Sequence, residues 1–383
     1  MGKSKNLIIG AASLGLAVLT CTGTSAGELM RNAAYASAGL YSEIEQTHEP
    51  APDNSSSSDY QTSETSETPS SAASSEIESI ESSAPEESSI PEEKPTGEVI
   101  TVNRTNVADE EDYSVYTARS GEINRYNIGN LDGIGYINLE SGAQVRNNTD
   151  IPNETLIKAL DELPEFHKNA DIKSPRVLIY HTHSNESFLP KSDWFDEDYP
   201  IISPDCSKNM IAVGDALCKA LAENGISVVH ECRMHDYPIF TGAYYRSAES
   251  IIENLEKYPD IDIVIDLHRD GFVNSDGSLG APVCEVNGKT AAQFMIISCC
   301  ENEDFDMPDY IENFKLACLL QNTAGEMYPG LSRPVLFDYR NYNQELSKGA
   351  LLIEVGSQGN SLDEAVYTGE LLGNVIAKAL TQD

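Results

Sequence analysis

The sequence predicts an α/β fold with a largely parallel central sheet and helices on both faces of that sheet. From about Ser174 onwards, short apolar runs rich in β-branched residues alternate with longer runs whose apolar residues recur with a period near 3.6. Several short runs are almost entirely apolar, as expected of strands buried on both faces of a parallel sheet. Such alternation is typical of α/β domains.

The first elements of this region follow from their residues in chain order. The run at 176–181 (RVLIYH) predicts a strand, and the helical run at 207–224 stops at Gly225, a residue that commonly ends helices. The β-branched run at 226–231 (ISVVHE) predicts the next strand. An amphipathic helix is then expected at 242–258.

The second half of the region repeats this pattern around one hairpin. The run at 262–268 (DIVIDLH) predicts a buried strand, and a turn-rich stretch at 274–282 leads to a strand at 291–298. The remaining elements are a helix at 308–328, a strand at 350–356 (ALLIEVG) and a closing amphipathic helix at 361–380.

Two folded regions are expected from this pattern. Residues 173–383 are expected to carry the chemistry, and residues 99–172 to form a small accessory region rich in β-structure. The short alternating runs and the single helical stretch of the accessory region fall at 123–129, 134–140, 143–148 and 154–163.

Residues 1–28 are expected to be an export signal or a membrane anchor. Two lysines precede an uncharged stretch whose densest apolar part has signal-peptide length, and the whole stretch is about long enough to cross a bilayer, which needs roughly 20 residues. Cleavage near Ala26, retention as an anchor with the lysines inside, and lipid attachment at Cys21 remain open. In each case the rest of the chain is expected outside the cytoplasmic membrane.

Residues 29–98 are expected to form a disordered tether. Residues 51–100 hold 12 acidic residues and one basic residue, a local charge of −11, together with 15 serines and five prolines. Such a segment has too little apolar surface to offset the entropy of ordering it, and its like charges repel one another. The tether is therefore expected to give the folded part reach.

The charge of the chain excludes one class of partner. The formal net charge is −37, and residues 101–383 carry −25 of it. Nucleic acids bind proteins mainly through lysine and arginine, so no nucleic-acid partner is expected. Anionic membrane surfaces are disfavoured for the same reason.

Ionisable residues directly follow three of the expected strands. The first strand leads into HTHSNE, which contains His181, His183 and Glu186; a later strand ends at His268, and the last contains Glu354. In open α/β sheets the site lies beyond the carboxyl ends of the strands. Imidazole nitrogen and carboxylate oxygen are ligands of Zn²⁺, so the sequence predicts a catalytic metal site at this edge.

Each of these features also has a simpler explanation. A single histidine at a strand end is more often a hydrogen-bonded surface residue than a ligand. The HxH pattern also arises by chance, although alternate positions on a strand would place His181 and His183 on one face. The combination is the stronger signal, because three of the seven histidines fall at the ends of consecutive buried strands.

Glu354 interrupts the apolar run ALLIEVG. Burying an unpaired carboxylate costs on the order of several kcal/mol, so this residue either lies at the mouth of the strand or has a functional role. Desolvation would raise its pKa, which suits a general base and acid near neutral pH. The alternative is a structural ion pair with Arg269 or Arg246.

Several long strings of the sequence resemble a known family. VLIYHTHSNESF, SKNMIAVGDALCKALAENGISVVHE, YPDIDIVIDLHRD and LLIEVGSQGNSLDEA are similar to the stage II sporulation protein P family of endospore-forming bacteria. The resemblance covers about residues 174–380, and the motifs keep their order. The uncharged N-terminal segment and the low-complexity tether are also typical of this family.

The resemblance implies a peptidoglycan hydrolase. It implies a zinc-dependent N-acetylmuramoyl-L-alanine amidase that also cleaves stem-peptide cross-links. It further implies a single-pass protein of the cytoplasmic membrane that works with other engulfment proteins at the septal membrane, its catalytic domain in the septal intermembrane space. The domain is similar to broader zinc amidases, whose pattern, laid on this sequence, gives His183 and His268 as ligands and Glu354 as the catalytic glutamate.

One departure from the broader amidases concerns the third ligand. Those enzymes take a glutamate from the helix after the first strand, and the corresponding region here, SPDCSKNMIAVGDAL, contains none. Glu186 is the expected substitute. Whether His181 binds zinc or orients the site from behind the ligands remains open.

The expected mechanism is zinc-assisted amide hydrolysis. Zn²⁺ held by the two histidines and Glu186 is expected to lower the pKa of bound water from 15.7 towards roughly 7. Glu354 is expected to take the proton and return it to the leaving amine. Arg269, His181 or Asn185 is expected to stabilise the oxyanion or to grip a stem-peptide carboxylate.

Two other functions are compatible with the sequence. A zinc peptidase acting only on stem peptides would use the same ligands. A non-catalytic wall-binding scaffold would carry a decayed site, and the intact histidines and Glu354 argue against decay.

Overall fold

The computed structural model describes residues 96–166, 173–302 and 306–381 of the 383-residue chain. The expected export segment at 1–28 and almost all of the expected tether at 29–98 lie outside these residues. Within the described part of the chain, no helix combines the length and the apolar character needed to cross a bilayer.

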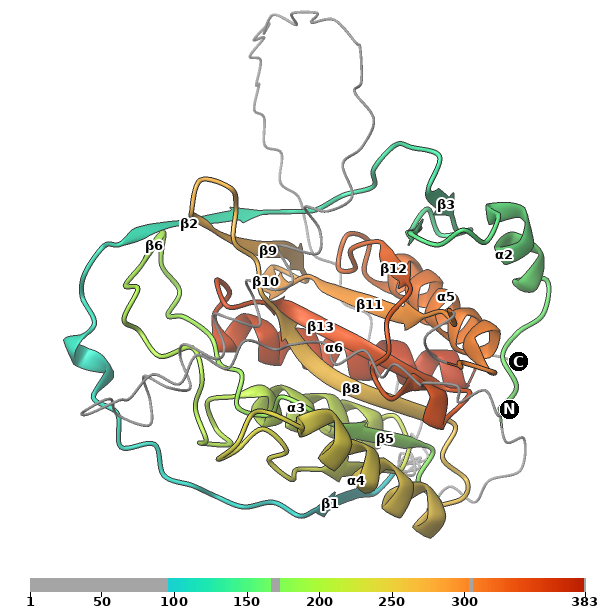
Figure 1. Cartoon of the computed structure of the whole chain (residues 1–383), viewed down its shortest axis with the longest axis horizontal. Helices are drawn as coiled ribbons and strands as arrows, with labels where there is room; N and C mark the ends of the chain where they lie inside the picture. Colours follow the sequence, from blue (N-terminus) through green and yellow to red (C-terminus); the bar gives the residue numbers. More distant parts are fainter. Residues whose placement is uncertain (1–95, 167–172, 303–305, 382–383) are drawn as a thin grey trace, which may run out of the picture.

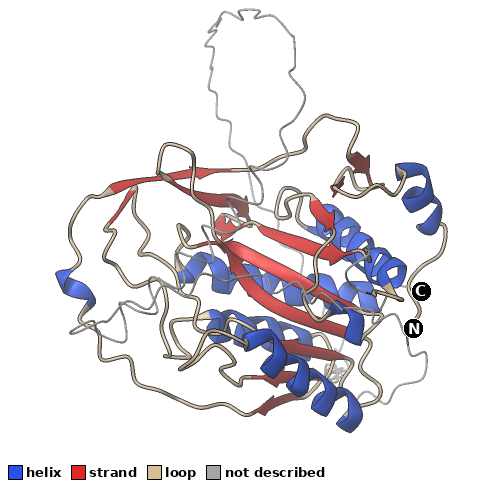
Figure 2. Cartoon of the chain, in the orientation of Figure 1, coloured by secondary structure: helices blue, strands red, loops and turns tan. Residues whose placement is uncertain are grey.

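A nine-stranded mixed sheet forms the centre of the protein (Figure 1, Figure 2). Six of the eight strand pairs in the sheet are parallel, and the two antiparallel pairs are β11 (Phe294–Cys299) with β13 (Ala350–Ser357) and β3 (Tyr136–Asn138) with β4 (Gln144–Asn147). The expected largely parallel sheet is therefore confirmed. The spatial order is β1 (Val99–Val102), β7 (Val228–Glu231), β5 (Val177–Tyr180), β8 (Ile263–Asp270), β13 (Ala350–Ser357), β11 (Phe294–Cys299), β12 (Val335–Asp338), β4 (Gln144–Asn147) and β3 (Tyr136–Asn138).

The region at 99–172 is joined to the rest of the protein by backbone pairing. It supplies β1 to one end of the main sheet and β3 and β4 to the other end. It also carries the short helix α2 (Asn153–Ala159). A second sheet contains β10 (Lys289–Ala292), β9 (Leu279–Val286), β2 (Gly121–Tyr126) and β6 (Trp194–Phe195), so the region expected to be accessory contributes a strand there too.

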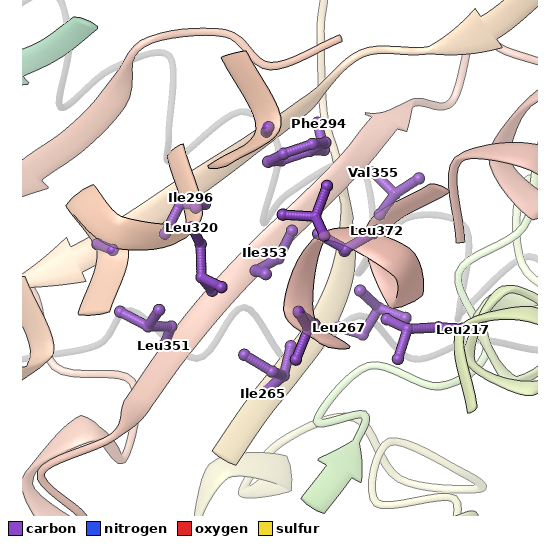
Figure 3. Close-up of a cluster of buried hydrophobic side chains, with 14 of the residues drawn as sticks. Leu217, Ile265, Leu267, Phe294, Ile296, Leu320, Leu351, Ile353, Val355 and Leu372 are labelled. Atoms are coloured by element: carbon purple, nitrogen blue, oxygen red, sulfur yellow. The ribbon is translucent and has the colours of Figure 1, made fainter. Parts of the chain in front are cut away.

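Helices cover both faces of the main sheet, as expected. The helices α3 (Met210–Glu223), α5 (Tyr310–Met327) and α6 (Leu362–Leu380) bury one face, and α4 (Ala243–Lys257) packs on the other. Figure 3 shows the larger core, in which Leu217, Leu320 and Leu372 from the three helices surround Ile353 and Leu267 of the sheet. The α4 face has a smaller apolar core, which leaves room for polar side chains at the strand ends.

Candidate metal centre

Three side chains meet at the carboxyl ends of β5 and β8. His183 and Glu186 lie in the segment that follows β5, and His268 lies on β8. One possible ligand atom from each side chain lies within 4.8 Å of the other two, and the rings of His183 and His268 have centroids 5.0 Å apart. In the described part of the chain this is the group of histidine, cysteine and acidic side chains that could hold a metal ion.

The register of the sheet places Glu354 beside His268. The two residues are direct neighbours on the parallel strands β13 and β8. Side chains alternate along a strand, so Asp266, His268 and Asp270 share one face of β8. The pairing becomes irregular just after Glu354, where Gly356 adopts a φ of +63° that favours glycine. The strand end thus gathers several carboxylates around one imidazole.

Asp266, two residues before His268 on the same face of β8, orients the ring of His268. The Nε2 of His268 lies 2.8 Å from Asp266 Oδ1, and its Nδ1 lies 3.6 Å from Glu186 Oε2. Asp266 also accepts hydrogen bonds from the backbone N and the hydroxyl of Thr182. A carboxylate on the far nitrogen of a ligand histidine commonly fixes the ring and raises its basicity. The geometry therefore presents Nδ1 of His268 to the metal group.

The electrostatics of the three side chains suit a divalent cation. Desolvation and the neighbouring His268 lower the pKa of His183 to about 3, so this ring is neutral and has a free lone pair. Burial lowers the pKa of His268, but Asp266 and Glu186 outweigh burial and raise it to about 10. Burial raises the pKa of Glu186. The cluster therefore favours a positive charge at its centre.

Glu354 has an unusual environment for a carboxylate. Its Oε2 is buried and has no hydrogen-bond partner among the described residues. Burial, followed by the charge of Asp270, raises the pKa of Glu354 to about 8, whereas Arg333, which pairs with Asp270 at 2.8 Å, opposes the rise. Neither Arg269 nor Arg246 forms an ion pair with Glu354 within the described residues, so the structural alternative lacks its expected partners.

His181 lies outside the metal group. Its Nδ1 donates a hydrogen bond to Leu267 O at 2.9 Å, and its Nε2 lies 3.0 Å from Nε2 of His230. The ring is completely buried next to Gly214 of α3. Both ring nitrogens are engaged, so the position of His181 does not support a role as a ligand.

His181 and His183 do not share a face of the sheet, contrary to the expectation from the HxH pattern. The strand β5 ends at Tyr180, and the chain turns over the next residues, so the alternation of side chains stops before His183. His183 instead stacks on Phe240 at 4.6 Å and meets the edge of Tyr244 of α4 at 5.5 Å. The two histidines therefore point to opposite sides of the sheet.

Arg269 also points away from the metal group. Its Nε donates to Ser187 O at 2.7 Å and its Nη2 to Ile201 O at 3.1 Å, so the guanidinium fastens the segment that carries Glu186. Its backbone N donates to a group member, Glu186 Oε2, at 3.1 Å. Alternation along β8 explains this placement, because neighbours of His268 face the other side. The position of Arg269 supports a positioning role and not the expected catalytic one.

The remaining expected candidate, Asn185, is held by an aspartate that the sequence does not single out. Asp236 accepts hydrogen bonds from the hydroxyl of Ser184 at 2.9 Å and from Nδ2 of Asn185 at 3.1 Å. Burial raises the pKa of Asp236 to about 6. These bonds fix the turn between His183 and Glu186. They use the side-chain nitrogen of Asn185, whereas its Oδ1 is buried and has no hydrogen-bond partner among the described residues.

Comparisons with known proteins bear on the family of the chain. Residues 28–377 match the stage II sporulation protein P family. The stage II sporulation protein P of Bacillus subtilis (strain 168) is 29% identical over 213 residues, which cover 53% of this chain and 50% of that protein. The chain thus matches about half the length of this curated relative.

Solved structures of amidases are also similar to part of the chain. N-acetylmuramoyl-L-alanine amidase AmiC2 of Nostoc punctiforme is 13% identical, with a TM-score of 0.32 over 55% of this chain and 97% of that chain. The apo form of N-acetylmuramyl-L-alanine amidase Ami1 from Mycobacterium abscessus is 13% identical, with a TM-score of 0.35 over 54% of this chain and 100% of that chain. The family match spans most of the sequence, and the chain belongs to the stage II sporulation protein P family.

Proposed function

We propose that this protein is a zinc-dependent peptidoglycan hydrolase of sporulation that cleaves the amide bond between N-acetylmuramic acid and L-alanine. The observation that carries the proposal is the group of His183, Glu186 and His268 beside Glu354, a carboxylate with a buried, unpartnered oxygen. Membership of the stage II sporulation protein P family supports the role in sporulation.

The residues of the group fit zinc. Catalytic zinc sites use three protein ligands and keep a fourth position open, and two imidazoles with one carboxylate are a common set. His268 turns its Nδ1 towards Glu186 while Asp266 lies 2.8 Å from its other nitrogen, and the lowered pKa of His183 keeps that ring neutral. Zn²⁺, when bound, supplies a Lewis acid that lowers the pKa of water towards roughly 7 and polarises the scissile carbonyl.

Glu354 has the properties of the proton carrier in this reaction. Its pKa, raised to about 8 by burial and Asp270, lies near neutral pH, where one carboxyl group can both accept a proton from water and return it to the leaving amine. Asp270 and Arg333 form an ion pair next to it, which keeps the neighbouring acidic side chain in place. Phe240 and Tyr244 pack on the ring of His183 and restrict its orientation.

We further propose cleavage of stem-peptide cross-links at the same centre, and a location at the cytoplasmic membrane. The uncharged segment at 1–28 would hold the protein there, with the catalytic domain outside and the acidic tether at 29–98 giving it reach. The proposed partners are peptidoglycan and other engulfment proteins at the septal membrane. The family match is the support for this part of the proposal.

Mass spectrometry of digested cell walls tests the proposed bond specificity. Zinc-loaded protein is expected to release intact stem peptides and to leave free lactyl groups on muramic acid. Shortened peptides still attached to glycan would identify a peptidase acting only on stem peptides. Walls left intact by a protein that binds zinc would favour the non-catalytic scaffold and contradict the proposal. Glu354→Gln is the control, since it keeps the shape of the side chain and removes the base.

A further inference from the structure

A second pair of histidines, His181 and His230, lies behind the metal group on the α3 side of the sheet. We propose that His181 is a positioning residue of the metal centre: it joins the end of β5, which leads to His183, to β8, which carries His268, and His230 orients its ring. The inference rests on the proposed function only in taking the group in front of the sheet to be a metal centre.

The connection made by His181 begins where backbone pairing stops. The last paired residues of β5 and β8 are Tyr180 and Asp266. The next residue of each strand is joined by a side chain instead, because Nδ1 of His181 donates to Leu267 O at 2.9 Å. Leu267 directly precedes His268, so this bond joins the two ligand-bearing segments, next to the bonds that Thr182 donates to Asp266.

His230 fixes the orientation of the His181 ring. A backbone carbonyl only accepts, so Nδ1 of His181 carries a proton and its Nε2 is available as an acceptor. The Nε2 of His230 lies 3.0 Å from it, within hydrogen-bond distance. The other nitrogen of His230 lies 3.1 Å from Asp215 Oδ1, and Asp215 pairs in turn with Arg104. The chain of contacts thus runs from the buried ring to charged groups nearer the surface.

The surroundings of the pair hold both rings in this geometry. Both rings are completely buried, and a Cβ at Gly214 of α3 would lie 2.6 Å from Nε2 of His230 and 2.8 Å from Nε2 of His181. On the other side, Nδ1 of His235 contacts the backbone oxygen of His181 at 2.9 Å, and its Nε2 contacts Ser250 Oγ at 2.9 Å. His181 is therefore held by contacts of both its side chain and its backbone. An apolar side chain would fill the same space but would leave Leu267 O without this donor.

Two conservative substitutions at position 181 separate the bond to Leu267 from the bond to His230. The amide of His181→Asn reaches the place of Nδ1 and keeps the bond to Leu267 O. The amide of His181→Gln reaches the place of Nε2 and keeps only the contact with His230. The zinc dissociation constant of the full-length protein is measured by competition with a chromophoric chelator. We expect a change of at most about threefold for His181→Asn and a loss of roughly tenfold or more for His181→Gln.

Equal zinc affinities of the two variants would overturn the inference. Equal and strong losses would mean that His181 is itself a ligand or only a packing residue, and equal, unchanged affinities would mean that the bond to Leu267 O is unimportant for the centre. Leu217→Ala, which removes a buried side chain of α3 outside the pair, is the control for stability. Leu217→Ala is expected to lower the Tm and to leave the zinc affinity unchanged. If it weakened zinc binding as much as His181→Gln does, the loss of affinity would be explained by general destabilisation of the protein.

A second measurement does not require zinc. In the metal-free, ¹⁵N-histidine-labelled protein, His181→Gln is expected to shift the imidazole signals of His183 and His268, and His181→Asn to leave them near their wild-type positions. Wild-type protein that binds no zinc would defeat the proposed function, and these spectra would still decide the positioning role. Unshifted signals in both variants would overturn it.

Discussion

The two histidine pairs at the ends of β5 and β8 are built from the same side chain and do different things. His183 and His268 lie on the α4 side with ring centroids 5.0 Å apart, and they meet the carboxylate of Glu186. His181 and His230 lie on the α3 side with centroids 5.3 Å apart, and their nitrogens contact each other, a backbone carbonyl and Asp215. The pair of His183 and His268 has ring nitrogens available for a metal ion. The pair of His181 and His230 uses its ring nitrogens in contacts within the protein.

The groups that contact the ring nitrogens of a histidine decide its role, and the HxH pattern does not. His181 and His183 are two residues apart in one HxH pattern, yet the end of the strand at Tyr180 sends them to opposite faces. On the α3 side both rings are completely buried beside Gly214, and buried polar groups are usually hydrogen-bonded. On the α4 side the polar strand ends gather beneath a smaller apolar core.

The largest expected effect comes from removing a ligand from the pair of His183 and His268. His183→Ala is expected to weaken zinc binding and the clearing of cell-wall suspensions by on the order of 10³-fold, because a metal supplies several kcal/mol of transition-state stabilisation. His230→Gln, a change in the pair of His181 and His230, is expected to cost about tenfold at most. Similar losses for the two variants would erase the distinction between the pairs. Turbidity clearing and metal analysis measure both.

The next substitution distinguishes proton transfer from metal binding at the group on the α4 side of the sheet. Glu354→Gln is expected to lower the rate of wall hydrolysis by about 10²–10⁴-fold, because it removes the general base. The zinc content of this variant is expected to equal that of the wild type, since Glu354 is not in the ligand group. A variant that clears walls at the wild-type rate would remove Glu354 from the mechanism.

A smaller effect is expected from the carboxylate that orients His268. Asp266→Asn is expected to weaken zinc binding by about 10- to 100-fold, because the ring of His268 loses its charged partner at 2.8 Å. Competition with a chelator measures the change. An unaltered dissociation constant would show that the orientation of His268 is set by packing alone.

The smallest expected effect comes from a substitution that tests the packing of His181 and His230. Gly214→Ala places a Cβ 2.6 Å from Nε2 of His230 and is expected to lower the free energy of unfolding by about 1–3 kcal/mol, as overpacking of a core does. Gly129→Ala is the control, because nothing lies within 4 Å of its Cβ, and a change within about 0.5 kcal/mol is expected. Denaturant unfolding provides both values, and equal stabilities would mean that α3 shifts freely over the histidines.

The sequence predicts the long elements of the fold because their patterns are local. The apolar run at 262–268 and the amphipathic run at 207–224 become β8 and α3 with small differences at their ends. The four-residue strand β12 is not among the elements predicted from the sequence. The backbone pairing of β1 and β4 with the main sheet depends on contacts between distant segments, so it has no local signal.

The candidate site is partly visible in the sequence for the same reason. His183, Glu186 and His268 follow strands directly, and the structure brings them together. Asp266 is not among the predicted site residues although it has a local signal, since it lies two residues before His268 on the same face of a strand. Arg333 has none: it reaches Asp270 only because β11 runs antiparallel to β13 and thereby brings the start of β12 to the site edge.

Anomalous diffraction at the zinc edge, from crystals of the zinc-loaded protein, tests the central claim most directly. One strong peak is expected within bonding distance of His183, Glu186 and His268, on the α4 side of the sheet. A peak between His181 and His230 on the α3 side, or no peak at the front group in zinc-loaded crystals, would contradict it.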